Sequence, residues 1–243
     1  MTDSRVLCWD LENTPMEVYS WGLWPKFIPT NMVINPSEML CFGAKWLGKP
    51  TKVYDQRMGY VEMLTVLRDL LTEADMVVSW NGQRFDTKKA NTEFVKHGLT
   101  PPAPYKELDL MKLAKLRFAF ASNKLDFVAQ ELGVGKKVDT GGFDLWKGVM
   151  AGDEAAWRKM RRYQKQDVDL LEELFYKLQG WMKIPHPIKE GEDRCRTCAS
   201  FNLQKRGTAR SLQGEYQRYQ CLDCGHWTNG TTRTPSTNQR EIS

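Results

Sequence analysis

The sequence lacks long apolar runs. None of its hydrophobic stretches approaches the roughly 20 residues with which a helix spans a bilayer, and residues 1–5 lack the hydrophobic character of a secretion signal. Internal repeats are also absent. We therefore expect a globular, cytoplasmic protein with no membrane partner.

Cysteines are few and unevenly distributed, which argues against a disulfide framework. Four of the six lie between Cys195 and Cys224, whereas Cys8 and Cys41 sit in apolar, strand-like segments. Closely spaced thiols in a cytosolic protein are typical of metal binding. The cysteine distribution therefore predicts a metal site near the C-terminal end.

Charge of one sign is not in large excess. The 35 basic and 30 acidic residues leave a net charge of +5, which suits nucleic-acid binding without requiring it. Residues 181–243 contain 10 Lys and Arg but only 6 Asp and Glu, so this segment carries +4 of the total. The basic excess is therefore concentrated in the last quarter of the chain.

The spacing of apolar residues divides the chain into strands followed mainly by helices. Strands are predicted at residues 6–9, 18–23, 40–47, 51–54 and 76–80, and helices at 60–74, 87–97, 109–118, 124–132, 153–160 (N-cap Asp153) and 161–179. This order favours a mixed α/β domain, with helices around a sheet, over residues 1–182. A linker (183–193), a small domain (194–228) and a disordered, apolar-poor tail (229–243) complete the predicted organisation.

Two acids at the first predicted strand are spaced so that their side chains lie on the same face of the strand. Asp10 and Glu12 are two residues apart, so their side chains project from the same face of an extended chain. Carboxylates held together near a core repel each other unless they are protonated, paired with basic groups or bound to a metal. Mg²⁺ and Mn²⁺ prefer oxygen ligands and would suit this pair. A structural ion pair with Lys or Arg is the alternative.

Two further acids are predicted to face the same region. Tyr163 and Asp167 belong to an apolar helical stripe that continues to Leu178, so Asp167 is on the buried face and Tyr163 lies one turn before it. The neighbouring Asp169 is expected to be a solvated surface charge. Asp86 follows the strand at residues 76–80 across a tight connection. The alternatives are a core aromatic role for Tyr163 and a helix N-cap role for Asp86.

Three segments together resemble, in order, the exonuclease motifs of the DEDD superfamily of 3′–5′ exonucleases. They are Asp10-Leu11-Glu12-Asn13-Thr14-Pro15, Asn81-Gly82-Gln83-Arg84-Phe85-Asp86 and Tyr163-Gln164-Lys165-Gln166-Asp167. The tyrosine with three intervening residues is typical of the DEDDy branch, and residues 122–129 and 152–163 are similar to the proofreading domain of family-B DNA polymerases. The resemblance spans residues 5–179 and implies a ribonuclease H-like mixed sheet.

The resemblance also implies roles for individual residues. Two Mg²⁺ or Mn²⁺ ions would be held by four acids, Asp10, Glu12, Asp86 and Asp167. Such ions activate water and stabilise the charge that develops on a phosphodiester, and Tyr163 would orient that water. The expected products are 5′-mononucleotides.

Substrate contacts follow from the same resemblance. Asn81 and Phe85 would lie close to the terminal nucleotides, and Asn123 and Lys124 would meet the substrate backbone. The alternatives are a core position for Phe85 and a solvated helix start for Asn123 and Lys124.

The clustered cysteines form two Cys-x-x-Cys pairs separated by 22 residues. The four thiolates of Cys195, Cys198, Cys221 and Cys224 would complete a tetrahedral shell around one structural Zn²⁺, which also supplies folding free energy to a small segment. Redox pairs or free thiols are the alternatives. His226 is left out because four cysteines already complete the shell.

Basic and aromatic residues accompany the cysteine pairs, as a surface that tracks phosphates and stacks bases would require. The predicted contacts are Lys205, Arg206, Arg210, Arg218, Tyr219 and Trp227. The segment 195–227 resembles zinc ribbons found at the ends of bacterial transposases, which implies DNA binding. A module that contacts proteins, for example in replication or repair, is the alternative.

The leading hypothesis is a free-standing 3′–5′ exonuclease of a bacterial or phage-infected cell. DNA is favoured over RNA as its substrate, and single-stranded DNA in particular. The alternatives are a catalytically silent nucleic-acid-binding or scaffolding protein and a structure-selective endonuclease. The complete set of four acids with Tyr163 favours the enzyme, since a silent protein would need no such set.

Overall fold

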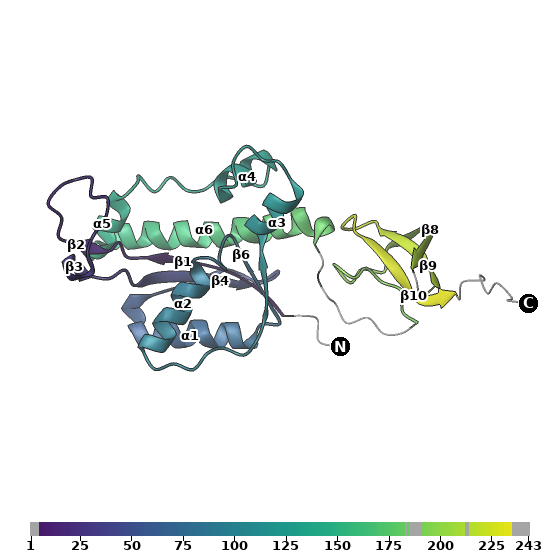
Figure 1. The fold of residues 1–243 in the computed structure, drawn as a ribbon, viewed down its shortest axis with the longest axis horizontal. Helices are drawn as coiled ribbons and strands as arrows, with labels where there is room; N and C mark the ends of the chain where they lie inside the picture. The colour runs from purple at the N-terminus through teal and green to yellow at the C-terminus, as the bar shows by residue number, and fades with distance from the viewer. Residues whose placement is uncertain (1–4, 183, 185–190, 212–213, 235–243) are drawn as a thin grey trace, which may run out of the picture. The chain divides into compact units, whose positions relative to one another are not determined.

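The computed structural model describes residues 5–182, 184, 191–211 and 214–234, and the chain forms two compact units that divide after Leu174. In Figure 1 the colour follows the chain from its N-terminus to its C-terminus. Most of the predicted linker (183–193) and the tail from residue 235 lie outside the described residues. Within the described ranges, no helix is both long and apolar enough to cross a membrane.

A mixed sheet forms the centre of the first unit, with the strand order β5-β4-β1-β6-β7. Its strands are β1 (Val6–Asn13), β4 (Met39–Trp46), β5 (Lys52–Asp55), β6 (Met76–Ser79) and β7 (Lys106–Asp109). β1 pairs antiparallel with β4 and parallel with β6, while β4–β5 is antiparallel and β6–β7 is parallel. This arrangement confirms the predicted mixed sheet and places the strand that carries Asp10 and Glu12 at its centre.

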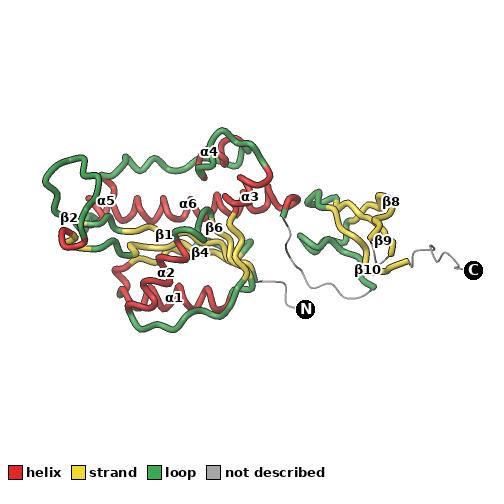
Figure 2. The backbone as a smooth tube through the Cα atoms, in the orientation of Figure 1, coloured by secondary structure: helices red, strands yellow, loops and turns green. Residues whose placement is uncertain are grey.

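Helices cover both faces of this sheet (Figures 1 and 2). The helical elements of the chain are η1 (Thr30–Met32), η2 (Gln56–Met58), α1 (Tyr60–Glu73), α2 (Asp86–Lys96), α3 (Leu110–Arg117), α4 (Leu125–Glu131), α5 (Asp144–Met150), α6 (Glu154–Leu178) and η3 (Gln179–Trp181). Leu7, Trp9 and Leu11 of β1 are buried against α1 and α2. Because side chains alternate along a strand, Asp10 and Glu12 belong to the opposite face, which α5 and α6 cover.

A glycine allows α6 to lie close to the sheet. Gly43 of β4 pairs with Asp10 of β1. A Cβ atom at Gly43 would lie 2.8 Å from Cγ2 of Val168 and 3.2 Å from the carbonyl oxygen of Gln164. The absence of a side chain therefore sets the spacing that brings this part of α6 beside β1.

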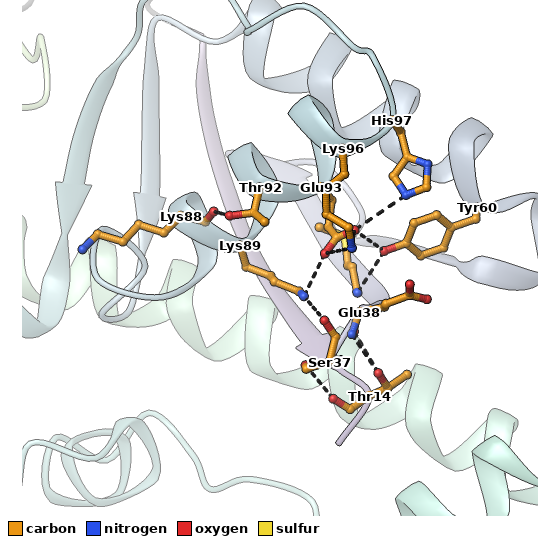
Figure 3. Close-up of polar contacts among 11 residues, drawn as sticks. Thr14, Ser37, Glu38, Tyr60, Lys88, Lys89, Thr92, Glu93, Lys96 and His97 are labelled. Atoms are coloured by element: carbon orange, nitrogen blue, oxygen red, sulfur yellow. Dashed lines mark hydrogen bonds and ion pairs between the residues drawn. The ribbon is translucent and has the colours of Figure 1, made fainter. Parts of the chain in front are cut away.

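A buried acid, Glu93 of α2, gathers several donors (Figure 3). Its carboxylate lies 2.8 Å from Nζ of Lys89 and 3.1 Å from Nζ of Lys96, and it accepts a 3.0 Å hydrogen bond from the Tyr60 hydroxyl. Burial by itself would raise the pKa of Glu93, but these donors outweigh burial and hold the pKa below its usual value. The Glu93 carboxylate is therefore a structural anion whose charge is balanced by its own hydrogen-bond donors and lysines.

The Glu93 cluster also holds the segment that follows β1. Lys89 donates to the carbonyl oxygen of Ser37, and the Ser37 hydroxyl donates to the carbonyl oxygen of Thr14 at 2.7 Å. The backbone N–H of Glu38 donates to the Thr14 hydroxyl at 2.9 Å. Figure 3 shows these contacts below the anion. These contacts fix the backbone at Thr14, two residues after Glu12, where the chain leaves β1.

The predicted strand at residues 18–23 is wrong apart from its first residue. β2 (Glu17–Val18) pairs with β3 (Val33–Asn35), and the residues between β2 and η1 form an open loop. Aromatic residues favour strands in a sequence-based prediction because they usually pack on a sheet. Here Trp21 and Trp24 are almost fully exposed, so that packing is missing.

Other elements of the first unit also differ from the prediction. β7 was not predicted because its residues 106–109 are mostly polar, and α5 was not predicted because it is short. The two predicted helices at residues 153–160 and 161–179 are one helix, α6, since no breaker separates them. The predicted cap is confirmed: the Asp153 carboxylate accepts the backbone N–H of Ala155 at 2.9 Å.

The second unit, residues 175–243, contains a three-stranded antiparallel sheet in the order β10-β9-β8. Its strands are β8 (Leu203–Ser211), β9 (Gly214–Cys221) and β10 (Trp227–Thr234). The prediction of disorder is therefore wrong for residues 229–234. Backbone pairing of Asn229 with Arg218 and of Arg233 with Tyr216 orders this segment although its composition is polar.

Replacing Gly43 by valine should push α6 away from β4 and destabilise the protein. Overpacking of this kind costs about 1–3 kcal/mol, and we expect a lower midpoint of chemical denaturation. Gly22→Val is the matched control, because a Cβ atom there meets nothing within 4 Å. Equal stability of Gly43→Val and the unchanged protein would contradict the close approach of α6.

Candidate metal centres

Three carboxylates meet on the α6 face of the sheet. One oxygen atom from each of Asp10, Glu12 and Asp167 lies within 4.8 Å of the others. The alternation along β1 presents the first two, and the apolar stripe of α6 presents the third, whose side chain is only 1% exposed. The structure thus brings together three of the four acids that the sequence singles out.

One cation, Lys137, lies at the edge of this cluster and was missed by the sequence analysis. Its Nζ atom lies 2.5 Å from Oδ2 of Asp167 and donates to the Tyr163 hydroxyl at 3.2 Å. The backbone N–H of Lys137 donates to Asp126 at 2.6 Å, which fixes the loop that carries it. One ammonium group cannot neutralise three carboxylates. In the described part of the chain, neither Asp10 nor Glu12 forms an ion pair with a basic side chain of its own.

The crowding of negative charge changes the acidity of the cluster. Burial, and then the charge of Asp167, raise the pKa of Asp10 to about 7, although Lys137 acts in the opposite direction. Burial and the charges of Asp10 and Asp167 raise the pKa of Glu12 to about 8. Burial would lower the pKa of Lys137, but the carboxylates outweigh it and raise that pKa. Without a bound cation the carboxyl groups therefore retain protons near neutral pH.

Asp86 flanks the cluster without joining the group of three. It is the first residue of α2, only 8% exposed, and the preceding Phe85 occupies the cap position, so the N-cap alternative is wrong. Burial raises the pKa of Asp86 to about 8, and the charge of Asp10 is the next contribution. The two carboxyl groups therefore interact across the site.

Gln164 is a further residue of the site that the sequence analysis did not identify. Its Nε2 atom donates to the carbonyl oxygen of Asp10 at 2.7 Å and to Oδ2 of Asp10 at 3.1 Å. The Gln164 side chain is fully buried between α6 and β1. It therefore fixes the position of one carboxylate relative to α6. The sequence carries one signal for this role, because Gln164 directly follows Tyr163 in the third motif.

The donor set fits a hard divalent cation. The three converging groups offer only oxygen atoms, which Mg²⁺ and Mn²⁺ prefer. Oδ1 of Asp167 is buried and has no hydrogen-bond partner, which is costly unless another ligand satisfies it. The raised carboxyl pKa values indicate that the same groups would exchange protons for a cation.

The loop between β6 and α2 presents Asn81 and Phe85. Asn81 adopts a left-handed conformation (φ 67°), which asparagine tolerates better than most residues, and its N–H donates to Asp109 at 2.9 Å. Asp109 also caps α3, so this acid joins the loop to the next strand and helix. Phe85 is 59% exposed, which excludes the alternative of a core side chain.

The other two predicted substrate contacts lie at the start of α4. The carbonyl oxygen of Asn123 accepts a 3.1 Å hydrogen bond from Nε1 of Trp80, so Asn123 is anchored near the end of β6. Lys124 is exposed and occupies the N-cap position of α4. Its place agrees with the alternative of a solvated helix start, and a substrate role stays a prediction.

Asp169, predicted to be a solvated surface charge, is only partly exposed and is paired with two lysines. Its carboxylate lies 3.1 Å from Nζ of Lys45 and 2.6 Å from Nζ of Lys165, and its side chain is 35% exposed. These contacts hold the pKa of Asp169 below its usual value in spite of partial burial. The residue therefore joins α6 to β4 and stays apart from the carboxylate cluster.

The second unit contains a four-cysteine cluster. The Sγ atoms of Cys195, Cys198, Cys221 and Cys224 all lie within 4.8 Å of one another, and all four thiols are free. Two of the Sγ–Sγ distances are 3.6 Å. A tetrahedral zinc ion with Zn–S bonds of about 2.3 Å separates its ligands by about 3.8 Å. The cluster therefore fits zinc without His226, as predicted.

Strand pairing divides the predicted nucleic-acid contacts of this unit between two faces. Trp227 of β10 pairs with Gln220 of β9. Arg218 lies two residues before Gln220 on the same strand, so Arg218, Gln220 and Trp227 share one face of the sheet. Lys205 pairs with Tyr219, and these two residues lie on the opposite face. Arg206 is exposed on β8. A single strand lying on one face would therefore meet only part of the predicted set.

Two of these side chains already have partners. The Tyr219 hydroxyl donates to Asp193 at 2.7 Å, and Nε of Arg210 lies 2.6 Å from Glu215. On the other face, a pocket of about 350 Å³ is available beside Trp227. Its lining residues are Arg196, Tyr216, Trp227, Thr228, Asn229 and Gly230.

Comparisons with known proteins relate the first unit to one superfamily. A model of the RNase H superfamily matches residues 42–179, a range that begins within β4 and so excludes Asp10 and Glu12. No curated protein matches the sequence. The family B DNA polymerase from the hyperthermophilic archaeon Pyrobaculum calidifontis is structurally similar, with a TM-score of 0.51 and 19% sequence identity. The similarity covers 72% of this chain but only 24% of that polymerase, and it concerns the fold alone.

The stability of the metal-free protein should fall as the pH rises. Asp10, Glu12 and Asp86 release their protons near pH 7–8 in the folded chain, against 3.8–4.5 for the free side chains. The folded state therefore binds these protons more tightly, and its advantage disappears as the pH passes through the raised values. In chelator, we expect the thermal midpoint to drop by several degrees between about pH 6 and 9.

Asp10→Asn should flatten this pH dependence, because it removes one of the repelling charges. Added Mg²⁺ should raise the midpoint most at high pH, where the carboxylates are free to bind it. A midpoint that increases steadily from pH 6 to 9 in chelator would contradict the proposed protonation of the cluster.

Proposed function

Because the chain belongs to the RNase H superfamily, we propose that it is a metal-dependent 3′–5′ exonuclease that releases 5′-mononucleotides, with single-stranded DNA as its preferred substrate. Membership of the superfamily supports a nucleic-acid-processing role. The observation that carries the finer proposal is the convergence of Asp10, Glu12 and Asp167 within 4.8 Å, beside Tyr163. That arrangement joins residues from the first and third of the motifs that resemble DEDDy exonucleases.

Divalent cations would be held by Asp10, Glu12 and Asp167, with Asp86 completing the site for a second ion. Mg²⁺ or Mn²⁺ bound to these groups would supply Lewis acidity and activate water for phosphodiester hydrolysis. The fit rests on the converging oxygen atoms and on the unsatisfied Oδ1 of Asp167.

The remaining residues of the site position and balance charge. Burial and the nearby carboxylates raise the pKa of Tyr163, so its phenol stays protonated and can orient a water molecule by hydrogen bonding without acting as a base. Gln164 holds Asp10 against α6. Lys137 offsets part of the negative charge while no cation is bound, through its contact with Asp167.

A terminal nucleotide would meet the loop that follows β6. The exposed ring of Phe85 offers a stacking surface, and the anchored backbone of Asn81 keeps this loop in a fixed conformation. The four-cysteine unit, as a zinc ribbon, would contribute to holding the strand through Arg218 and Trp227, which share one face. Contacts of the ribbon with replication or repair proteins are the alternative.

The activity is tested with single strands labelled at either end, incubated with Mg²⁺ or Mn²⁺. We expect label from the 3′ end to appear at once as mononucleotide, a descending ladder from the 5′-labelled strand, and intact circular single strands. Asp10→Ala and Asp167→Ala should each lower the rate at least about a hundredfold, since each removes a group that acts on developing charge.

Asp144→Ala is the matched control, because this side chain is 83% exposed on α5. Mononucleotide release that survives both cluster substitutions would refute the proposed active site. Cleavage of the circular strand would instead indicate an endonuclease, and salt-sensitive binding without any divalent-dependent turnover would indicate a silent binding protein.

The zinc assignment is tested by metal analysis of the purified protein. We expect about one zinc ion per chain, lost on Cys198→Ser because a four-thiolate shell then lacks one ligand. His226→Ala should retain the metal, since His226 lies outside the cluster. A zinc-free protein with ordered β8–β10 strands would contradict a structural metal.

A further inference from the structure

The loop between β2 and η1 exposes an unusual set of large apolar side chains. We name residues 19–27 the aromatic arm. Its large apolar residues are all exposed: Tyr19 (70% exposed), Trp21 (95%), Leu23 (90%), Trp24 (93%) and Phe27 (77%). Single exposed apolar residues are common on proteins, but a contiguous exposed set usually marks an interaction surface. The exposed set therefore marks the arm as an interaction surface.

The base of the arm is held firmly although its rings are free. The N–H of Tyr19 donates to the carbonyl oxygen of Met32 at 2.8 Å, which closes the loop. Nε1 of Trp146 in α5 donates to the carbonyl oxygen of Asn13 at 3.1 Å, just before β2. Figure 1 shows the loop projecting beside α5, beyond the end of β1. The arm therefore follows β1, the strand that carries Asp10 and Glu12, after a short connection that includes β2.

The charge of the arm suits a polyanion. No acidic residue occurs between Glu17 and Glu38, a gap of 20 residues in a chain with 30 acids, and Lys26 lies within the arm. The indole rings of Trp21 and Trp24 pair with no other ring in the described part of the chain, so their faces are free. Separate free rings suit successive unpaired bases, each of which needs one ring face.

We propose that the aromatic arm binds single-stranded nucleic acid by stacking bases on Trp21, Trp24 and Phe27. This inference deepens the proposed function and rests on it, because it names the surface that would hold the strand beside the active site. Stacking on an aromatic side chain contributes a factor of about 5 to 150 in affinity for each base. It is also tolerant of sequence, as a nuclease that degrades any strand requires.

The proposal is tested by measuring the affinity of the full-length protein for a labelled oligothymidylate in chelator, where no hydrolysis occurs. The double variant Trp21→Ala/Trp24→Ala should bind at least about tenfold more weakly. Trp21→Phe/Trp24→Phe should recover most of the affinity, since a ring remains. Leu116→Ala is the matched control, because Leu116 is 75% exposed on α3, away from the arm, and its removal should change nothing.

The dependence of binding on salt separates stacking from phosphate contacts. The alanine double variant should keep the salt slope of the unchanged protein, because it removes no phosphate contact. Unchanged affinity of this variant would overturn the proposal. So would dissociation of an oligomer by the same substitutions, since the rings would then be covered by a second copy of the chain.

The inference and the proposed function fail separately. If the protein shows no divalent-dependent hydrolysis but the alanine double variant loses affinity for the strand, the proposed nuclease activity is contradicted and the proposed role of the arm is supported. An active nuclease whose affinity for the strand is unchanged in the alanine double variant would contradict the proposed role of the arm and support the proposed nuclease activity.

Discussion

Mutual repulsion among crowded, partly buried carboxylates is the constraint on which the first unit depends. Asp10 and Glu12 project from the central strand and Asp167 from the helix that covers it, and burial leaves little water to screen their charges. The folded chain tolerates this arrangement by partial protonation and by the contact of the Lys137 ammonium group with Asp167. A divalent cation would relieve the same repulsion more completely, which gives metal binding and folding a common energetic origin.

The surrounding structure keeps the charges together. Gly43 admits α6 to the surface of the sheet, and Gln164 bonds across that contact to Asp10. On the opposite face, Glu93 collects two lysines and a tyrosine and fixes the chain shortly after Glu12. These two anionic regions differ in kind. Glu93 is satisfied by its own donors, whereas the cluster retains an unpaired oxygen atom on Asp167.

Periodic patterns made much of this site predictable from the sequence. Alternation along a strand placed Asp10 and Glu12 on one face, and the apolar stripe of α6 placed Asp167 on its buried side; both placements agree with the structure. Lys137 was not predictable, because a lysine in an irregular loop carries no periodic signal. The strand predicted over residues 18–23 failed for a related reason: aromatic residues indicate burial only when a surface is available to pack against them.

Divalent binding by the carboxylate cluster is the property that links the folded structure most directly to the proposed activity. Titration of the chelator-treated protein with Mn²⁺, followed by electron paramagnetic resonance near neutral pH, measures this binding without requiring substrate. We expect the signal of free Mn²⁺ to be depleted by the unchanged protein and restored in Asp167→Asn, with Asp144→Asn behaving like the unchanged protein. Mn²⁺ that stays free in the unchanged protein, or binding that persists in Asp167→Asn, would contradict a metal site at this cluster.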